Sequence, residues 1–117
     1  MNRTITLYGI ANCDTVKKAR AWLDARGAVY AFHDYKKAGI DADTLTRWAG
    51  EVGWEVLLNR AGTTYRKLPD GDKVALDAAK AIALMVAQPS MIKRPVVTGV
   101  GALQVGFKPE IYAERFA

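Results

Sequence analysis

The sequence predicts a small α/β protein built on a mixed four-stranded sheet, and three observations predict it. Strand-like residues at 4–8 and 29–35 flank an amphipathic stretch at 15–26, as expected for a strand–helix–strand unit. Segment 96–105 carries a Gly-Val-Gly turn between two apolar runs, as in an antiparallel hairpin. Residues about 40–90, between these halves, are mostly helical in pattern. We therefore expect a helical insertion between two sheet-forming halves, with helices on both faces of the sheet.

Composition is that of an ordinary globular protein, and residues 1–117 are expected to form one domain. No apolar run approaches the ~20 residues of a membrane span. Residues 1–5 lack the long apolar region of a signal peptide. Together with a single, unpaired cysteine, these absences favour the cytoplasm.

The formal net charge of +5 favours anionic partners such as acidic small molecules, an acidic protein face or nucleic acid. A solvated basic surface is the alternative explanation. The sequence carries no aromatic RNA-binding pattern and no zinc finger, so we expect no direct nucleic-acid binding. One cysteine and one histidine exclude an intramolecular disulfide and make a protein-only zinc site implausible, so no metal is expected.

The first half is expected to run strand, helix, strand and loop. Gly9 ends the first strand, and the helix at 15–26 ends at Gly27. The second strand spans 29–35, and 36–39 is a loop. The two strands are expected to be parallel, and the crossover between them right-handed. The predicted inner face of the helix consists of Val16, Ala19 and Leu23.

The insertion is predicted to begin with a helix that Asp41 caps and Gly53 ends. Residues 54–58 form one or two helical turns, and the polar, basic stretch 59–67 is a loop. Asp43, like Asp41, is interpreted as a capping residue. The tryptophans Trp22, Trp48 and Trp54 are interpreted as core or interface residues.

The second half of the insertion is predicted to form a helix at 73–87, with its cap at 70–72. Its inner face would consist of Ala75, Ala78, Ala79, Ile82 and Val86. Strands at 96–98 and 102–106 and a terminal helix at 109–117 complete the chain. This order is that of a thioredoxin-like plan with extra helices between its halves.

Cys13 lies in the turn between the first strand and the first helix. A sulfur there faces unpaired N–H groups and the positive end of the helix dipole, and both favour the thiolate. Lys17, one turn along, can lie beside the sulfur, whereas the like charge of Asp14 disfavours the thiolate. The alternative is a small buried apolar residue. Val16 occupies the position of a second cysteine, so an external thiol must resolve any mixed disulfide.

Three basic residues adjoin loops or strand ends and are candidates for anion binding: Arg60, Arg94 and Lys108. The planar fork of arginine matches a carboxylate or an oxyanion, and solvated surface cations are the alternative. Arg94 precedes Pro95, where a cis peptide bond would present backbone to an extended thiol ligand in a thioredoxin-like plan. An ordinary trans proline at a strand start is the alternative. His33 is interpreted as a packed or surface histidine.

Motifs along the whole chain closely resemble the ArsC/Spx family, and within it the YffB-type ArsC-related proteins. They are Tyr8–Gly9–Ile10–x–Asn12–Cys13–Asp14–Thr15–Val16–Lys17–Lys18–Ala19, Asn59–Arg60–x–Gly62–Thr63–x–x–Arg66–Lys67, Ile92–Lys93–Arg94–Pro95 and Gly106–Phe107. The resemblance implies a thioredoxin-like fold with a helical insertion and a nucleophilic Cys13. It also implies that Arg60, Arg94 and a third basic residue, here Lys108, surround the cysteine as in the glutaredoxin-coupled arsenate reductases.

Two positions depart from those reductases, which have a histidine at the position of Gly9 and a serine at that of Val16. Both departures argue against arsenate reduction. Spx regulators, which bind RNA polymerase, often carry a Cys-x-x-Cys switch, and Val16 removes it here. The YffB-type proteins have one cysteine and are thought to act as glutathione-dependent thiol reductases.

The leading hypothesis is therefore a glutathione-dependent thiol oxidoreductase with Cys13 as nucleophile and no bound cofactor. Lys17 would stabilise the thiolate, Arg94, Arg60 and Lys108 would bind a carboxylate or oxyanion, and backbone near Pro95 would pair with glutathione. One alternative is arsenate reduction with glutathione and glutaredoxin. The other is a non-enzymatic, Spx-like protein that binds RNA polymerase.

Overall fold

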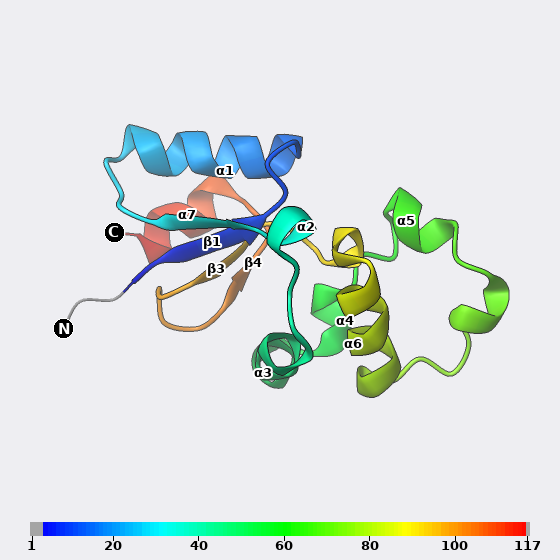
Figure 1. The fold of residues 1–117 in the computed structure, drawn as a ribbon. Coiled ribbons are helices and arrows are strands. Elements are labelled where there is room, and N and C mark those ends of the chain that lie inside the picture. Colours follow the sequence, from blue (N-terminus) through cyan, green and yellow to red (C-terminus); the bar gives the residue numbers. More distant parts are fainter. Residues whose placement is uncertain (1–3, 117) are drawn as a thin grey trace. The chain divides into compact units, whose positions relative to one another are not determined.

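The computed structural model describes residues 4–116, which fall into two compact units. The sheet unit comprises the chain up to Ala38 and from Arg94 onward, and the helical insertion comprises Gly39–Lys93. Figure 1 traces both along the chain. Among residues 4–116, no helix combines the length and the hydrophobicity that a bilayer crossing requires.

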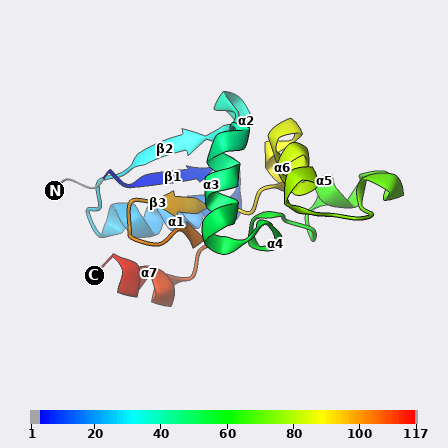
Figure 2. The same ribbon diagram turned by 90° about the horizontal axis from the view of Figure 1, so that it is seen from below.

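The sheet unit contains a mixed four-stranded sheet in the order β2-β1-β3-β4 (Figures 1 and 2). Its strands are β1 (Thr6–Gly9), β2 (Ala31–Asp34), β3 (Val96–Thr98) and β4 (Gln104–Val105). β1 runs parallel to β2 and antiparallel to β3, and β3 pairs antiparallel with β4. The predicted mixed four-stranded sheet is confirmed, as are the parallel strand–helix–strand unit and the antiparallel hairpin.

Two helices, α1 (Asp14–Ala25) and α7 (Pro109–Arg115), pack on one face of this sheet. Leu7 and Val97 are paired across β1 and β3, so they present this face together. The fully buried members of the shared core are Leu7, Val16, Ala19, Leu23, Val97 and Tyr112. The predicted inner face of the first helix, Val16, Ala19 and Leu23, is therefore confirmed.

The end of the second strand differs from the prediction. β2 stops at Asp34, and Tyr35 begins the short helix α2 (Tyr35–Ala38), where a loop was predicted at 36–39. The reason is local: an Asp34 carboxylate oxygen accepts hydrogen bonds from the backbone N–H groups of Lys36 and Lys37, at 3.0 and 3.3 Å. This is an N-cap, which favours a helical turn. The predicted terminal helix ends at Arg115 as α7, and Ala117 lies outside the described residues.

The first part of the insertion agrees with the prediction. In α3 (Ala42–Val52), the Asp41 carboxylate accepts from the Thr44 N–H at 2.7 Å, and Gly53 ends the helix with a φ of 88°. The short helix α4 (Trp54–Leu57) is the predicted helical turn.

The second part of the insertion corrects two predictions. The predicted loop at 59–67 contains a helical turn, α5 (Thr63–Arg66). The helix predicted from residue 73 begins later, as α6 (Ala78–Ala87), because Asp77 caps it by accepting from the Lys80 N–H at 2.8 Å. Two short 3₁₀ helices, η1 (Asp70–Asp72) and η2 (Pro89–Met91), flank α6 in sequence.

The predicted inner face of this helix is also wrong. Ala81 and Met85 are the buried residues of α6, whereas the predicted Ala75 is exposed and lies in the preceding loop with a φ of 51°. All residues of α6 except Lys80 are apolar, so the sequence pattern marks no single face. The Lys80 ammonium donates to carbonyls of Gly71 and Val74, which holds this loop out of the helix.

Candidate active site around Cys13

Cys13 is the N-cap residue of α1 and follows a tight turn after β1. Its backbone is extended, with φ −109° and ψ 128°. Its N–H donates to the Ile10 carbonyl at 3.1 Å, and its carbonyl accepts from the Lys17 N–H at 2.9 Å. The side chain is half-buried and the thiol is free. The sulfur therefore lies at the amino end of the helix, where backbone N–H groups lack carbonyl partners.

Arg94 brings a positive charge to this sulfur from 81 residues away in the chain. Its Nε donates a hydrogen bond to Cys13 Sγ at 3.3 Å. The Arg94–Pro95 peptide bond is cis, and the next residue, Val96, begins β3 beside β1. Of the two alternatives for Pro95, the structure thus has the cis form, and Arg94 lies beside Cys13.

The groups around Cys13 favour its thiolate. Partial burial raises the pKa of the thiol, but the Val16 N–H, the Arg94 guanidinium and the Thr15 N–H all lower it. The net effect is a pKa below that of an ordinary cysteine. A sulfur that is both accessible and ionised is a nucleophile.

Tyr35, at the start of α2, is a further neighbour of Arg94 that the sequence did not indicate. Its side chain is fully buried. Burial raises the pKa of its hydroxyl, and the charge and hydrogen bond of Arg94 act in the opposite direction. Because burial dominates, the group stays a neutral phenol that can accept from the guanidinium. Arg94 is thus held by Tyr35 as well as by Cys13, which fixes its position.

Asp34 anchors the loop that carries Cys13, and it too was missed. One carboxylate oxygen accepts from the Ala11 N–H at 3.1 Å, while the other caps α2. Burial raises the pKa of Asp34, but the N–H groups of Ala11, Lys36 and Lys37 and the charge of Lys37 bring it below the usual value. A signal existed in the sequence: Asp34 precedes Tyr-Lys-Lys-Ala and Gly39, a cap followed by a short helical stretch and a stop.

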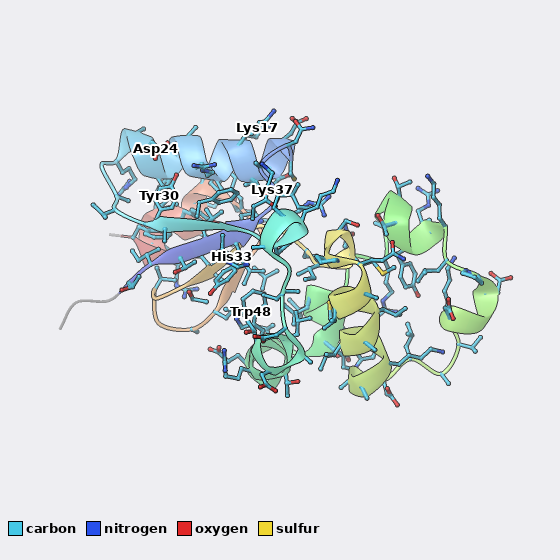
Figure 3. All side chains as sticks on the ribbon, in the orientation of Figure 1. Lys17, Asp24, Tyr30, His33, Lys37 and Trp48 are labelled. Atoms are coloured by element: carbon cyan, nitrogen blue, oxygen red, sulfur yellow. The ribbon has the colours of Figure 1, made fainter. Side chains whose placement is uncertain are left out.

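The other predicted site residues occupy different settings. Lys17, labelled in Figure 3, is exposed on α1. Its ammonium donates to Oδ1 of Asn12, the residue before Cys13, at 3.4 Å. Lys108 is exposed and is the N-cap residue of α7. Pro95 is buried, and its carbonyl accepts from the Gly106 N–H at 2.8 Å. Arg60 belongs to the helical insertion, where its guanidinium lies 5.4 Å from the Trp54 ring centroid. The approach of Arg60 and Lys108 to the sulfur stays a prediction.

Gly9 and Val16, the two departures from the arsenate reductase pattern, contact each other. A Cβ atom added to Gly9 would lie 2.7 Å from a methyl carbon of Val16, which is fully buried in the core. The valine methyl groups therefore occupy the space that a side chain at position 9 needs. The two departures form one packed pair, and a larger residue at position 9 requires a smaller one at position 16.

His33 lies across from Tyr8 in the β1–β2 pairing, with ring centroids 5.0 Å apart, as expected for a packed histidine (Figure 3). Within residues 4–116, no three histidine, cysteine, aspartate or glutamate side chains are grouped so that they could hold a metal ion.

A mixed sheet with a cysteine at the start of its first helix and a cis proline at the start of the neighbouring strand defines a thioredoxin-like protein. A model of the ArsC family matches residues 8–115. The chain therefore belongs to the ArsC family.

Two solved structures and one curated relative are similar over most of the chain. A protein named YFFB is 60% identical with a TM-score of 0.94, covering 97% of this chain and 100% of that one. The solution structure of an arsenate reductase (ArsC) related protein from Brucella melitensis is 58% identical with a TM-score of 0.78, covering 99% and 97%. The global transcriptional regulator Spx from Streptococcus mutans is 28% identical over 108 residues, which are 91% of this chain and 78% of that protein.

Proposed function

We propose that this protein is a glutathione-dependent thiol oxidoreductase in which Cys13 is the nucleophile. The observation that supports it most is the 3.3 Å hydrogen bond from Arg94 Nε to Cys13 Sγ, at the amino end of α1. Arginine beside an accessible sulfur favours the thiolate, which is the reactive form in disulfide exchange.

The reaction takes place in two exchanges. The Cys13 thiolate attacks the glutathione sulfur of a glutathionylated substrate, a Cys13–glutathione disulfide forms, and the substrate leaves as a thiolate that takes up a proton. The thiolate of a second glutathione then attacks the glutathione sulfur of this mixed disulfide. Glutathione disulfide forms, and Cys13 returns as a thiolate. Because Cys13 is the only cysteine of the chain, the second step needs an external thiol.

Arg94 has a second role in this scheme. Once Cys13 is part of a disulfide, its sulfur carries no charge, and the guanidinium is left to bind a carboxylate of glutathione. Lys17, Lys108 and Arg60 are proposed to add positive charge around the same ligand. Pro95 lacks an N–H, and its carbonyl already accepts from Gly106, so pairing with the tripeptide backbone uses the remaining lone pair of that carbonyl.

Arsenate reduction with glutathione and glutaredoxin is a second candidate, which the similarity to the ArsC-related protein of Brucella melitensis favours. The packing of Gly9 against Val16 opposes it, because no side chain from either position assists the thiolate. Binding to RNA polymerase is a third candidate, which rests on the similarity to Spx. A pull-down with this protein that fails to enrich polymerase subunits removes that candidate.

The test is an exchange assay with a glutathionylated peptide and glutathione, in which formation of glutathione disulfide is followed. We expect turnover by the wild type, a Cys13–glutathione adduct by mass spectrometry, and no turnover by Cys13→Ser. Arg94→Gln should turn over slowly, whereas the matched control Arg47→Gln, on the exposed surface of α3, should equal the wild type. A parallel incubation with arsenate, glutathione and glutaredoxin decides for the second candidate if arsenite forms. Absence of both the adduct and the turnover contradicts the proposal.

A further inference from the structure

A hollow in the sheet unit lies at the end of β1 opposite to Cys13. Ile5, which precedes β1, contributes to its wall together with Val100 and Phe116, and Arg26 and Arg115 also line it. Its volume is about 430 Å³, which is in the range of roughly 300–1,000 Å³ that small-molecule sites occupy. We call it the Arg26–Arg115 pocket.

Both arginines of this pocket lack a carboxylate partner within residues 4–116. The Arg115 guanidinium donates to Gln104 Oε1 at 2.8 Å and to the carbonyls of Val100 and Ala102, all of which are neutral. Arg26 lies over the Trp22 ring, 4.6 Å from its centroid. Two full positive charges therefore line one hollow, and Arg115 keeps donors that these contacts do not use.

The remainder of the lining is largely apolar. Ile5 and Phe116 pack at the edge of the core, and Val29 is 88% exposed, the most exposed of the large apolar side chains described. Such a pocket suits a ligand whose apolar part covers the exposed apolar surface and whose negative charge neutralises the arginines. A small hydrophilic anion would leave the apolar wall exposed to water. A neutral apolar molecule would leave the charges of Arg26 and Arg115 without a counter-charge.

We propose that the Arg26–Arg115 pocket binds an amphipathic organic monoanion. Its carboxylate or sulfonate lies between the two guanidinium groups, and its hydrocarbon tail covers Val29, Val100 and Phe116. This site is independent of the proposed thiol chemistry, since it uses neither Cys13 nor Arg94.

Titration with sodium decanoate, followed by backbone amide shifts in NMR, tests the proposal with the full chain. For an anion of this size we expect saturation with a Kd of about 0.1–1 mM. The largest shifts should fall on Ala28, Gly99 and Val100. Decanol and butyrate, which each lack one half of the proposed ligand, should bind at least about tenfold more weakly. Binding should be unchanged in Cys13→Ser, so failure of this proposal and failure of the thiol chemistry are separable.

Two variants at an exposed position make the test specific. Val29→Glu places a carboxylate on the wall of the pocket that both arginines line and should weaken decanoate binding at least about tenfold. The matched variant Val29→Gln removes the same apolar surface and has the same length without the charge, so decanoate should bind Val29→Glu more weakly than Val29→Gln. Arg26→Gln should lose affinity as well, and thermal unfolding of each variant verifies that it is folded. Arg115 is left intact because it holds three acceptors of the β3–β4 region.

Three outcomes overturn the proposal. One is the absence of saturable shifts at millimolar decanoate. Another is equal binding of decanol and decanoate, which shows that the arginines play no part. The third is a Val29→Glu variant that binds as well as Val29→Gln, because the charge then acts elsewhere.

Discussion

The two longest helices of the insertion, α3 and α6, begin differently from the first helix of the sheet unit. α3 and α6 each begin at an aspartate, Asp41 or Asp77, whose carboxylate accepts from the N–H three residues on, at 2.7 and 2.8 Å. α1 begins at Cys13, which makes no comparably close hydrogen bond to the helix backbone by its side chain. In α1 the corresponding first-turn N–H groups, those of Thr15 and Val16, are directed at the Cys13 sulfur instead of a carboxylate.

This difference separates stability from reactivity. An aspartate cap stabilises a helix because the oxygen is small, charged and a good acceptor. A thiol is a weak acceptor, so α1 forgoes part of that stabilisation. In return, the N–H groups of Val16 and Thr15, with Arg94, lower the pKa of the half-buried Cys13 thiol. Asp41 and Asp77 thus stabilise the starts of α3 and α6, whereas the groups at the start of α1 lower the pKa of the Cys13 thiol.

The sharpest way to break this comparison is to give α1 the cap of the other helices. Cys13→Asp should abolish thiol exchange completely and raise the free energy of unfolding by about 1 kcal/mol, the value of a good N-cap. Cys13→Ser should be equally inactive with a smaller gain. Urea unfolding and the exchange assay measure the two effects. A Cys13→Asp protein that is less stable than the wild type shows that the sulfur was already an adequate cap.

The next largest effect is expected at Arg94, whose guanidinium donates directly to the sulfur at the start of α1. Arg94→Gln removes a donor to the thiolate, so the pKa of Cys13 should rise. The rate of alkylation at neutral pH should then fall roughly tenfold, the worth of one charge-assisted hydrogen bond. Iodoacetamide labelling from pH 5 to 10 measures this, since the wild-type profile should reach its plateau at a lower pH. Superimposable profiles would show that the helix N-terminus alone ionises the sulfur.

The sheet unit was more predictable from sequence than the insertion, and the reason is periodicity. Val16, Ala19 and Leu23 recur on one helical face, and the strands alternate, so each element buries the side that its pattern indicates. In α6 every residue but Lys80 is apolar, and no pattern distinguishes its buried residues Ala81 and Met85. Its start depends on the Asp77 cap and on hydrogen bonds from Lys80 to the preceding loop, which hydrophobic periodicity does not reveal.

The candidate site was predictable where local rules define it. Cys13 at a strand-to-helix turn follows from the sequence around it, and Arg94 was one of several cations that family resemblance placed nearby. Tyr35 and Asp34 were missed because their importance comes from contacts across the sheet unit, to Arg94 and to Ala11. A single sequence shows that these residues are present but does not show which of them contact each other in the fold.

Asp34 should show a smaller effect than Arg94, because it acts on Cys13 only through the loop. Asparagine has one acceptor oxygen, so Asp34→Asn can serve either Ala11 or the start of α2, but not both. We expect alkylation of Cys13 to change by only a few fold, roughly the worth of one backbone hydrogen bond. Asp43→Asn, at an exposed aspartate in the first turn of α3, is the matched control.

The pH dependence of stability gives a second readout at Asp34. Its pKa is lowered in the folded protein, so its contribution to stability is fully present above the unfolded value of about 3.9 and is lost as the pH falls through the folded value. The wild type should therefore exceed Asp34→Asn in urea resistance at pH 7, and the difference should shrink at pH 3. A difference that is the same at both values shows that the charge of Asp34 is immaterial.

The smallest effect on reactivity is expected at Asp77, where the comparison predicts none. Asp77→Ala removes the cap of α6 and should lower the free energy of unfolding by about 1 kcal/mol, whereas Asp77→Asn keeps an acceptor and should cost less. Neither variant should change the alkylation profile of Cys13, because the cap of α6 serves only its own helix. Parallel urea and labelling experiments on the two variants verify this. If Asp77→Ala altered the reactivity of Cys13, helix starts in the insertion would contribute to the chemistry, and the division between a stabilising and an activating use of the helix N-terminus would no longer hold.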